Sequence, residues 1–263
     1  MYLSRKHGFL HVGVPRTGSV ASFQAIRSSD ISDHSDVYAV FPSKSNKKFR
    51  KHLSDNLPNK DKTLEELITI LGLPGERDSP VESTLQFYYR NDYLGPIVKK
   101  GILLHHMTPS HLVKLGVITE GELASYYCWG LVRDPLERWL SGQFLIRKLA
   151  ASVSDAMAQL VDVVRSGEYR EHHPIVAPYL KDYFFHEGQQ VVTPFQYDNL
   201  TNVTGDFIET FGGRRPESVP IYGITNVVPE AFKEPMESWF PSDCIEALTE
   251  FYAEDYEFYN SVP

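Results

Sequence analysis

Four short runs of apolar residues along the chain are typical of buried strands. They lie at Gly8–Val14, Ile102–His105, Tyr126–Val132 and Gln190–Tyr197. The run at 126–132, YYCWGLV, is rich in aromatic and apolar side chains, as the interior strand of a parallel sheet is. The run at 8–14 ends directly before a proline, which marks the end of the predicted strand.

Between these runs, apolar residues recur at the three- and four-residue spacing of helices. The sequence predicts helices at Ser19–Arg27, from Ser152 or Ser154 to Gly167, from Leu200 to Gly212, and from about Ser242 to Tyr259. Because strands alternate with helices, we expect an α/β fold, a single domain over residues 1–263 with a central parallel sheet flanked by helices.

The composition is that of an ordinary globular protein. The 263 residues include 26 Lys and Arg against 34 Asp and Glu, a net charge of −8. A chain with two cysteines cannot form a disulfide framework, so we expect a reducing, cytoplasmic location. The acidic balance disfavours nucleic acid as a partner. The apolar runs are too short for a membrane span or a secretory signal.

We interpret segment 28–100 as a variable insertion that, with segment 150–187, shapes an acceptor pocket, and its part at 44–62 departs from the alternation of strands and helices. Within it lies a basic stretch that is either a solvated surface or a rim that attracts an anionic ligand. Its seven basic residues are Lys44, Lys47, Lys48, Arg50, Lys51, Lys60 and Lys62.

The first candidate motif follows the predicted strand at 8–14 and reads Val14-Pro15-Arg16-Thr17-Gly18-Ser19. A helix that begins here presents unpaired backbone N–H groups and partial positive charge to an anion. Gly18 allows the backbone to approach a phosphate or sulfate, Thr17 and Ser19 add hydroxyls, and Arg16 adds a fixed charge. The motif lacks the lysine pattern of a Walker A loop, and a plain turn is the alternative interpretation.

The second motif, Arg133-Asp134-Pro135-Leu136-Glu137-Arg138-Trp139-Leu140-Ser141, follows the predicted strand at 126–132. Asp134 suits the N-cap of a helix, Pro135 its first position, and Glu137 the third position of a capping box. Arg133 and Ser141 would then converge on a second phosphate. The alternative is that Arg133 only pairs with Asp134 or Glu137.

In this order the two motifs resemble those of the sulfotransferases that use 3′-phosphoadenosine 5′-phosphosulfate (PAPS), in particular the carbohydrate branch. Shorter likenesses are His105-His106-Met107-Thr108, Gln196 to Leu200, and Asn226 followed by Phe251 to Tyr256. The resemblance covers most of the chain outside 28–100. It departs at Arg16, where the family usually has a lysine that stabilises charge on the leaving oxygen; arginine can also donate there, but as a planar group and not a compact ammonium.

The resemblance implies that PAPS is the donor and 3′-phosphoadenosine 5′-phosphate (PAP) the product, that no metal is needed, and that the acceptor is a hydroxyl, of a carbohydrate by family analogy. The 5′-phosphosulfate would bind a P-loop-like strand–loop–helix, and the 3′-phosphate the second motif. We expect His106, or else His105, to act as the base, and Arg16 to act in catalysis. The expected donor-binding residues are Pro15, Arg16, Thr17, Gly18, Ser19, Val20, Arg133 and Ser141.

Three further interpretations stay open at the level of sequence. The Arg214-Arg215 pair either touches the nucleotide or is a solvated pair at a helix end. A small-molecule kinase would need ATP and Mg²⁺, but a P-loop lysine is missing from the first motif. A non-catalytic nucleotide-binding module would explain Arg16 in place of lysine.

Overall fold

The computed structural model describes residues 1–32, 37–38, 107–114, 116–147, 153–170, 179–219 and 240–263. The predicted strand at Ile102–His105, the basic stretch at 44–62 and most of segment 28–100 lie outside these residues.

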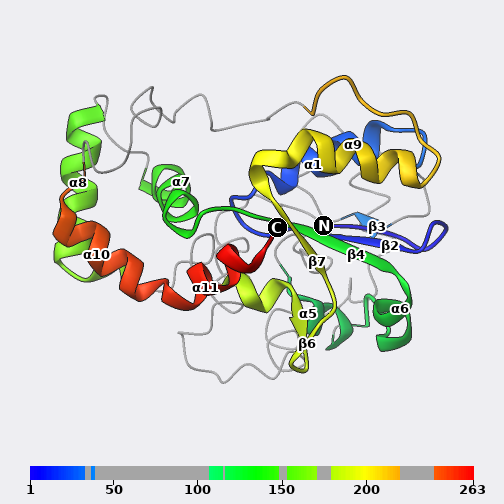
Figure 1. The fold of residues 1–263 in the computed structure, drawn as a ribbon, viewed down its shortest axis with the longest axis horizontal. Coiled ribbons are helices and arrows are strands. Elements are labelled where there is room, and N and C mark those ends of the chain that lie inside the picture. Colours follow the sequence, from blue (N-terminus) through cyan, green and yellow to red (C-terminus); the bar gives the residue numbers. More distant parts are fainter. Residues whose placement is uncertain (33–36, 39–106, 115, 148–152, 171–178, 220–239) are drawn as a thin grey trace, which may run out of the picture.

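The described chain is a mixed α/β structure built on a five-stranded sheet (Figure 1). In spatial order the strands are β3 (Val37–Tyr38), β1 (Tyr2–Ser4), β2 (Phe9–Val12), β4 (Tyr127–Val132) and β7 (Thr193–Gln196). Strands β2, β4 and β7 are parallel, and β4 lies between the other two, as the sequence predicts for an interior strand.

The sheet is mixed, whereas the sequence predicts a parallel one. Strand β1 pairs antiparallel with both β2 and β3. The turn at residues 5–8 joins β1 to β2, and a connection this short allows only an antiparallel hairpin. Gly8 lies in this turn at φ +67°, a conformation that glycine adopts without strain.

The predicted strand at Gln190–Tyr197 is divided in the structure. Gln190 belongs to a separate hairpin of β5 (Phe185–His186) and β6 (Gln189–Gln190), while β7 begins at Thr193. The division arises because the backbone N–H groups of Val191 and Val192 both donate to the Phe184 carbonyl, at 2.9 and 3.2 Å, and so leave the ladder.

Helices cover both faces of the sheet (Figure 1). Helices α1 (Ser19–Ser28) and α9 (Leu200–Thr210) lie on one face, α5 (Pro109–Lys114) and α6 (Glu120–Ser125) on the other. The start of α1 and the end of α9 before Gly212 agree with the sequence prediction. Short 3₁₀ turns are formed by Glu168–Arg170, Leu180–Tyr183 and Tyr197–Asn199.

A second apolar cluster forms beyond the carboxyl ends of the parallel strands, between α7 (Pro135–Arg147), α8 (Val153–Arg165) and α10 (Ser242–Phe251). Helix α8 agrees with the predicted helix that ends before Gly167. The centre of this second cluster includes Trp139 of α7, Leu160 of α8 and Leu248 of α10, each at most 1% exposed.

The predicted helix at Ser242–Tyr259 is wrong in one respect, because the structure has two helices there. Helix α10 ends at Phe251 and α11 (Ala253–Ser261) begins one residue later, with Tyr252 between them at φ −97° and ψ 21°. The bend lets α10 pack against α8 while α11 packs beside the 3₁₀ turn at 180–183. A straight helix would bury only one of these two surfaces.

None of the helices in the described ranges is long and apolar enough to cross a membrane.

Candidate functional site

The loop between β2 and α1 contains two residues with left-handed backbone. Arg16 has φ +64° and Gly18 has φ +76°. A residue other than glycine at such an angle costs on the order of 1 kcal/mol and is common at binding sites. The buried Thr17 hydroxyl donates to the Val14 carbonyl at 3.0 Å and so braces the loop from within.

The first turn of α1 leaves backbone donors available. The Gly18 carbonyl accepts from the N–H groups of Ala21 and Ser22, at 2.8 and 3.1 Å. The preceding N–H groups of Ser19 and Val20 have no acceptor within the described part of the chain, and the first turn carries no acidic side chain. The combination gives this end of the helix a positive potential.

Helix α7 begins at the carboxyl end of β4 in the way that the sequence predicts. Asp134 Oδ1 accepts from the backbone N–H groups of Leu136 and Glu137, both at 2.9 Å, as an N-cap does. Burial raises the pKa of Asp134 above its usual value, although these two hydrogen bonds act in the opposite direction. The Tyr256 hydroxyl also lies 3.5 Å from Oδ1.

Arg16 and Ser141 connect the two loops directly. The Arg16 guanidinium donates to Ser141 Oγ from Nη2 at 2.7 Å and from Nε at 3.1 Å. The two residues are 125 positions apart in the sequence and belong to different motifs. Since β2 and β4 are adjacent and parallel, their carboxyl ends lie at one edge of the sheet, and the two motifs meet there.

Arg133 pairs with Glu137, which is one of the two partners that the alternative interpretation of the second motif gives it. Its Nε donates to Glu137 Oε2 at 3.0 Å, one helical turn away, so Glu137 does not complete a capping box. The two terminal amino groups of Arg133 have no acceptor among the described residues, and the side chain is 19% exposed. Among the described residues, the hydrogen bonds of the Ser141 hydroxyl are to Arg16.

Tyr197 contacts both motifs, although the sequence analysis names it only within the likeness at 196–200 and gives it no binding role. It follows β7 directly, and its ring lies 4.8 Å from Arg133 Cζ in a cation–π arrangement. The same ring packs on Gly18, where an added Cβ would lie 2.7 Å from the Tyr197 Cε2 atom. The signal in the sequence is its place after the third parallel strand, the edge where the other two loops meet.

A buried ion pair joins helix α7, which contains most of the second motif, to helix α11. Arg138 Nη2 lies 2.8 Å from Asp255 Oδ2, and neither side chain is exposed. Asp255 Oδ1 also accepts from the backbone N–H of Leu180 at 2.7 Å, and the Tyr252 ring lies beside the guanidinium. The motif at 133–141 and the closing segment at 251–256 are therefore packed against each other.

The two candidate bases, His106 and His105, lie outside the described residues. The chain that follows them is buried at Met107 and Thr108. Thr108 Oγ1 lies 2.6 Å from His111 Nδ1, and burial, with a smaller effect of Lys114, lowers the pKa of His111 to about 4. His111 is therefore neutral near pH 7.

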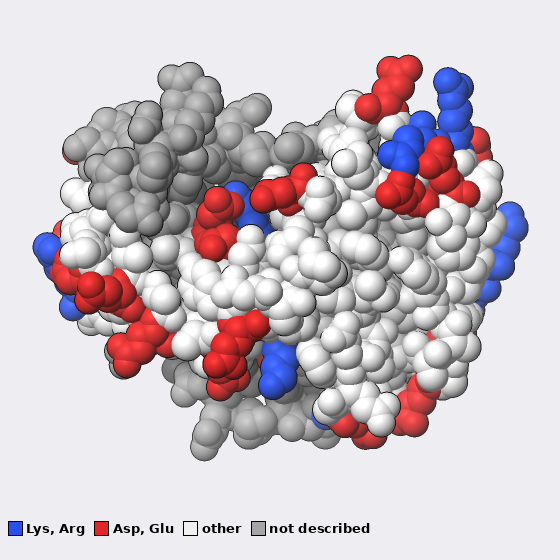
Figure 2. Space-filling model, in the orientation of Figure 1, with Lys and Arg blue, Asp and Glu red and all other residues white. Residues whose placement is uncertain are grey.

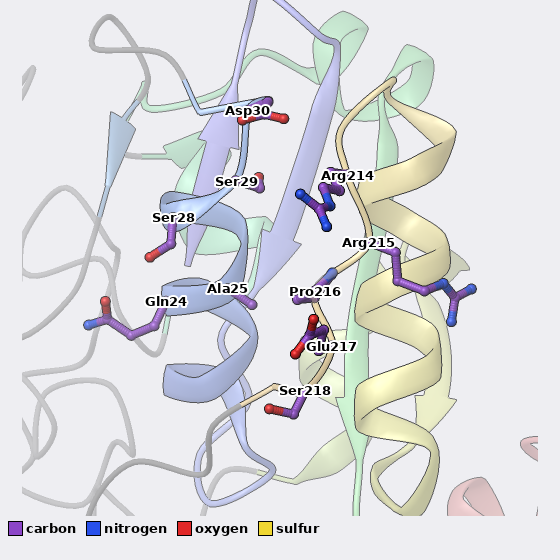
Figure 3. A pocket seen from close by; sticks show the side chains of 10 residues that line it. All are labelled: Gln24, Ala25, Ser28, Ser29, Asp30, Arg214, Arg215, Pro216, Glu217 and Ser218. Carbon is purple, nitrogen blue, oxygen red and sulfur yellow. The ribbon is translucent and has the colours of Figure 1, made fainter.

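A pocket of about 500 Å³ lies between the last turns of α1 and the segment that follows α9 (Figure 3). Arg214 points toward this pocket, while Arg215 points away and pairs with Asp206 and Glu209. The pocket lies toward the carboxyl end of α1, and its nearest lining residue on this helix, Gln24, is about 9 Å along the axis from Gly18. Arg215 therefore lies on the surface at the end of α9, in agreement with the second of the two interpretations of Arg214-Arg215.

Charge on the described surface is mixed and mostly acidic. Figure 2 shows acidic side chains over α10 and α11, and the sequence of these two helices contains no lysine or arginine. The exposed acidic residues of the two helices are Asp243, Glu246, Glu250, Glu254 and Glu257.

Comparisons of the chain with protein-family models, with curated proteins and with solved structures gave no match.

Proposed function

We propose that the protein is a PAPS-dependent sulfotransferase that transfers a sulfuryl group to an acceptor hydroxyl. The observation that carries the proposal is the contact of Arg16 with Ser141, 2.7 Å between Nη2 and Oγ. A ligand with phosphates at both ends of an adenosine requires two anion-binding loops side by side. The meeting of the two motifs at one edge of the sheet supports such a ligand.

The loop at 13–18 would hold the 5′-phosphosulfate in the manner of a P-loop. The N–H groups of Ser19 and Val20 point from the first turn of α1 without an acceptor in the described chain, and Arg16 adds charge beside them. The Thr17 hydroxyl is already committed to Val14, so we assign to Thr17 its backbone N–H. These donors fit an anion better than a neutral ligand.

The second loop would hold the 3′-phosphate. Arg133 can keep its Nε on Glu137 and still offer its two terminal amino groups, which have no acceptor in the described chain. The Tyr197 ring under the guanidinium limits the directions that Arg133 can take. Ser141 would contribute a hydroxyl while it accepts from Arg16, and so would link the two phosphate sites.

In the proposed reaction the bound donor supplies an activated sulfuryl group. The bond from sulfur to the acceptor oxygen forms as the bond to the bridging oxygen breaks, and PAP leaves. By analogy with phosphoryl transfer, Arg16 and the helix N–H groups would stabilise the charge that develops on the departing phosphate. His106, or else His105, would accept the proton of the acceptor hydroxyl. None of these steps requires a metal ion.

We propose a carbohydrate hydroxyl as the acceptor, on the resemblance to the carbohydrate branch alone. Segment 28–100 would shape the acceptor pocket. A kinase or a non-catalytic module of the same architecture would share the two loops but would differ in the nucleotide bound or in turnover.

The experiment is transfer of labelled sulfate from PAPS to a panel of sugars, alcohols and tyrosine peptides. We expect label on at least one acceptor, and we expect His106→Ala to lower turnover by about 10²- to 10⁴-fold while PAP binding is retained. Normal turnover of that variant would remove His106 from its role. Phosphate transfer from ATP with Mg²⁺ would identify a kinase, and PAP binding without transfer to any acceptor would identify a non-catalytic module.

A further inference from the structure

We propose that Glu120, His186 and Glu187 form a binding site for a divalent transition-metal ion. Each residue offers one ligand atom, and these three atoms lie within 4.8 Å of one another. Glu120 is the first residue of α6, whereas His186 ends β5 and Glu187 begins the turn to β6. Two segments more than 60 residues apart in the sequence thus bring three metal-binding groups together.

The imidazole of His186 is held in the way that metal-binding histidines usually are. Ser110 Oγ in α5 lies 2.9 Å from His186 Nδ1 and fixes the orientation of the ring. The other nitrogen, Nε2, is enclosed and has no hydrogen-bond partner in the described part of the protein. An enclosed ring nitrogen without a partner is unfavourable, and a metal ion would satisfy it.

The carboxylates of Glu120 and Glu187 have no ion-pair partner among the residues that the structure describes. Arg5 pairs with a different glutamate of α6, Glu122, at 2.8 Å. Two carboxylates this close repel each other, and a divalent cation between them would turn the repulsion into attraction. Both glutamates are exposed, so an ion can enter from solvent.

The donor set selects the kind of ion. One imidazole nitrogen with two carboxylate oxygens suits Zn²⁺, Mn²⁺ or Fe²⁺, whereas Ca²⁺ and Mg²⁺ prefer oxygen ligands alone. Three protein ligands leave at least one position for water. A bound ion would tie the hairpin of β5 and β6 to α6, and through Ser110 to α5.

This site is separate from the proposed nucleotide site. The hairpin and α6 lie across the sheet from α1 and α9 (Figure 1). The metal proposal therefore does not depend on the sulfotransferase proposal, and each can fail without the other.

The experiment is a calorimetric titration of the EDTA-treated full chain with ZnCl₂ near pH 7.5, in a buffer without phosphate. We expect one saturable site per chain. The exposed double variant Glu120→Gln/Glu187→Gln should bind Zn²⁺ at least tenfold more weakly, and Ser110→Ala about tenfold more weakly. The matched control Glu246→Gln/Glu250→Gln, which removes two exposed charges of α10, should bind like the wild type.

Two further readouts separate a built site from general loss of structure. Zn²⁺ should raise the melting temperature of the wild type but not that of the Glu120→Gln/Glu187→Gln variant. Co²⁺ should give visible absorption bands that His186→Ala removes. The proposal is overturned if the wild type binds no Zn²⁺, or if the double glutamine variant binds Zn²⁺ as tightly as the wild type does.

Discussion

His11 is a polar residue at the centre of the sheet. It belongs to β2, is fully buried, and its ring centroid lies 4.5 Å from that of Trp129. Neither of its ring nitrogens has a hydrogen-bond partner in the described chain. Burial lowers the pKa of His11 well below its ordinary value of 6.5, so the folded protein holds this histidine neutral.

Stability should therefore fall as the pH falls below about 6.5. In that range the unfolded chain takes up a proton that folded His11 does not, so the free energy of unfolding drops by up to about 1.4 kcal/mol per pH unit for this group. His11→Leu should show a smaller loss between pH 6 and pH 4, measured by urea unfolding. His111 keeps a similar contribution in both proteins.

Val12→Ala serves as the control, because it loosens the same buried strand without removing a titratable group. It should lower stability at every pH and leave the slope unchanged. Equal slopes in the wild type and in His11→Leu would contradict the assignment.

At single residues, local chemistry was predictable and long-range partners were not. The Asp134 cap follows from residue types two and three positions away. The partner of Arg16 could not be predicted in the same way, because Ser141 is distant in sequence and only the pairing of β2 with β4 brings it close. The same holds for Tyr197, whose contact with Gly18 is a consequence of tertiary packing.

At the scale of elements, a buried ion pair joins helices α7 and α11. Arg138 in α7 and Asp255 in α11 are both fully buried. A second ion pair, between Arg165 of α8 and Asp243 of α10, also joins two helices, but its side chains are 57% and 60% exposed. A buried charge that loses its partner is costly, whereas an exposed one is solvated by water.

Asp255→Asn should accordingly destabilise the protein by about 3–5 kcal/mol, since it removes a buried negative charge that pairs with the buried guanidinium of Arg138. Chemical unfolding measures this loss. Asp243→Asn is the matched control and should change stability little. Replacing both partners, as Arg138→Met with Asp255→Asn, should recover part of the loss; a double variant no more stable than Asp255→Asn would argue against a charge effect.

Elements with a clear start or stop were predictable from the sequence. The start of α1 after Gly18 and the end of α9 before Gly212 follow from glycine and from apolar spacing. Strand β1 was missed because three residues carry no usable periodicity. The break at Tyr252 was missed because periodicity continues across it, and only the two different packing surfaces of α10 and α11 reveal it.

For the whole molecule, the alternation of strands and helices correctly indicated an α/β structure with helices on both faces. It could not indicate that β1 would enter the same sheet antiparallel. The order of the parallel strands, β2, β4 and β7, is what places three loops at one edge. The proposed function depends on this arrangement more than on any single residue.

The central claim is that these loops hold one nucleotide with a phosphate at each end. Calorimetric titration with PAP tests it most directly. We expect one PAP per chain, at least tenfold weaker binding by Arg16→Ala and by Arg133→Ala, and wild-type binding by Arg165→Ala, an exposed arginine of α8. Failure of the wild type to bind PAP, with binding of ATP in its place, would contradict the claim.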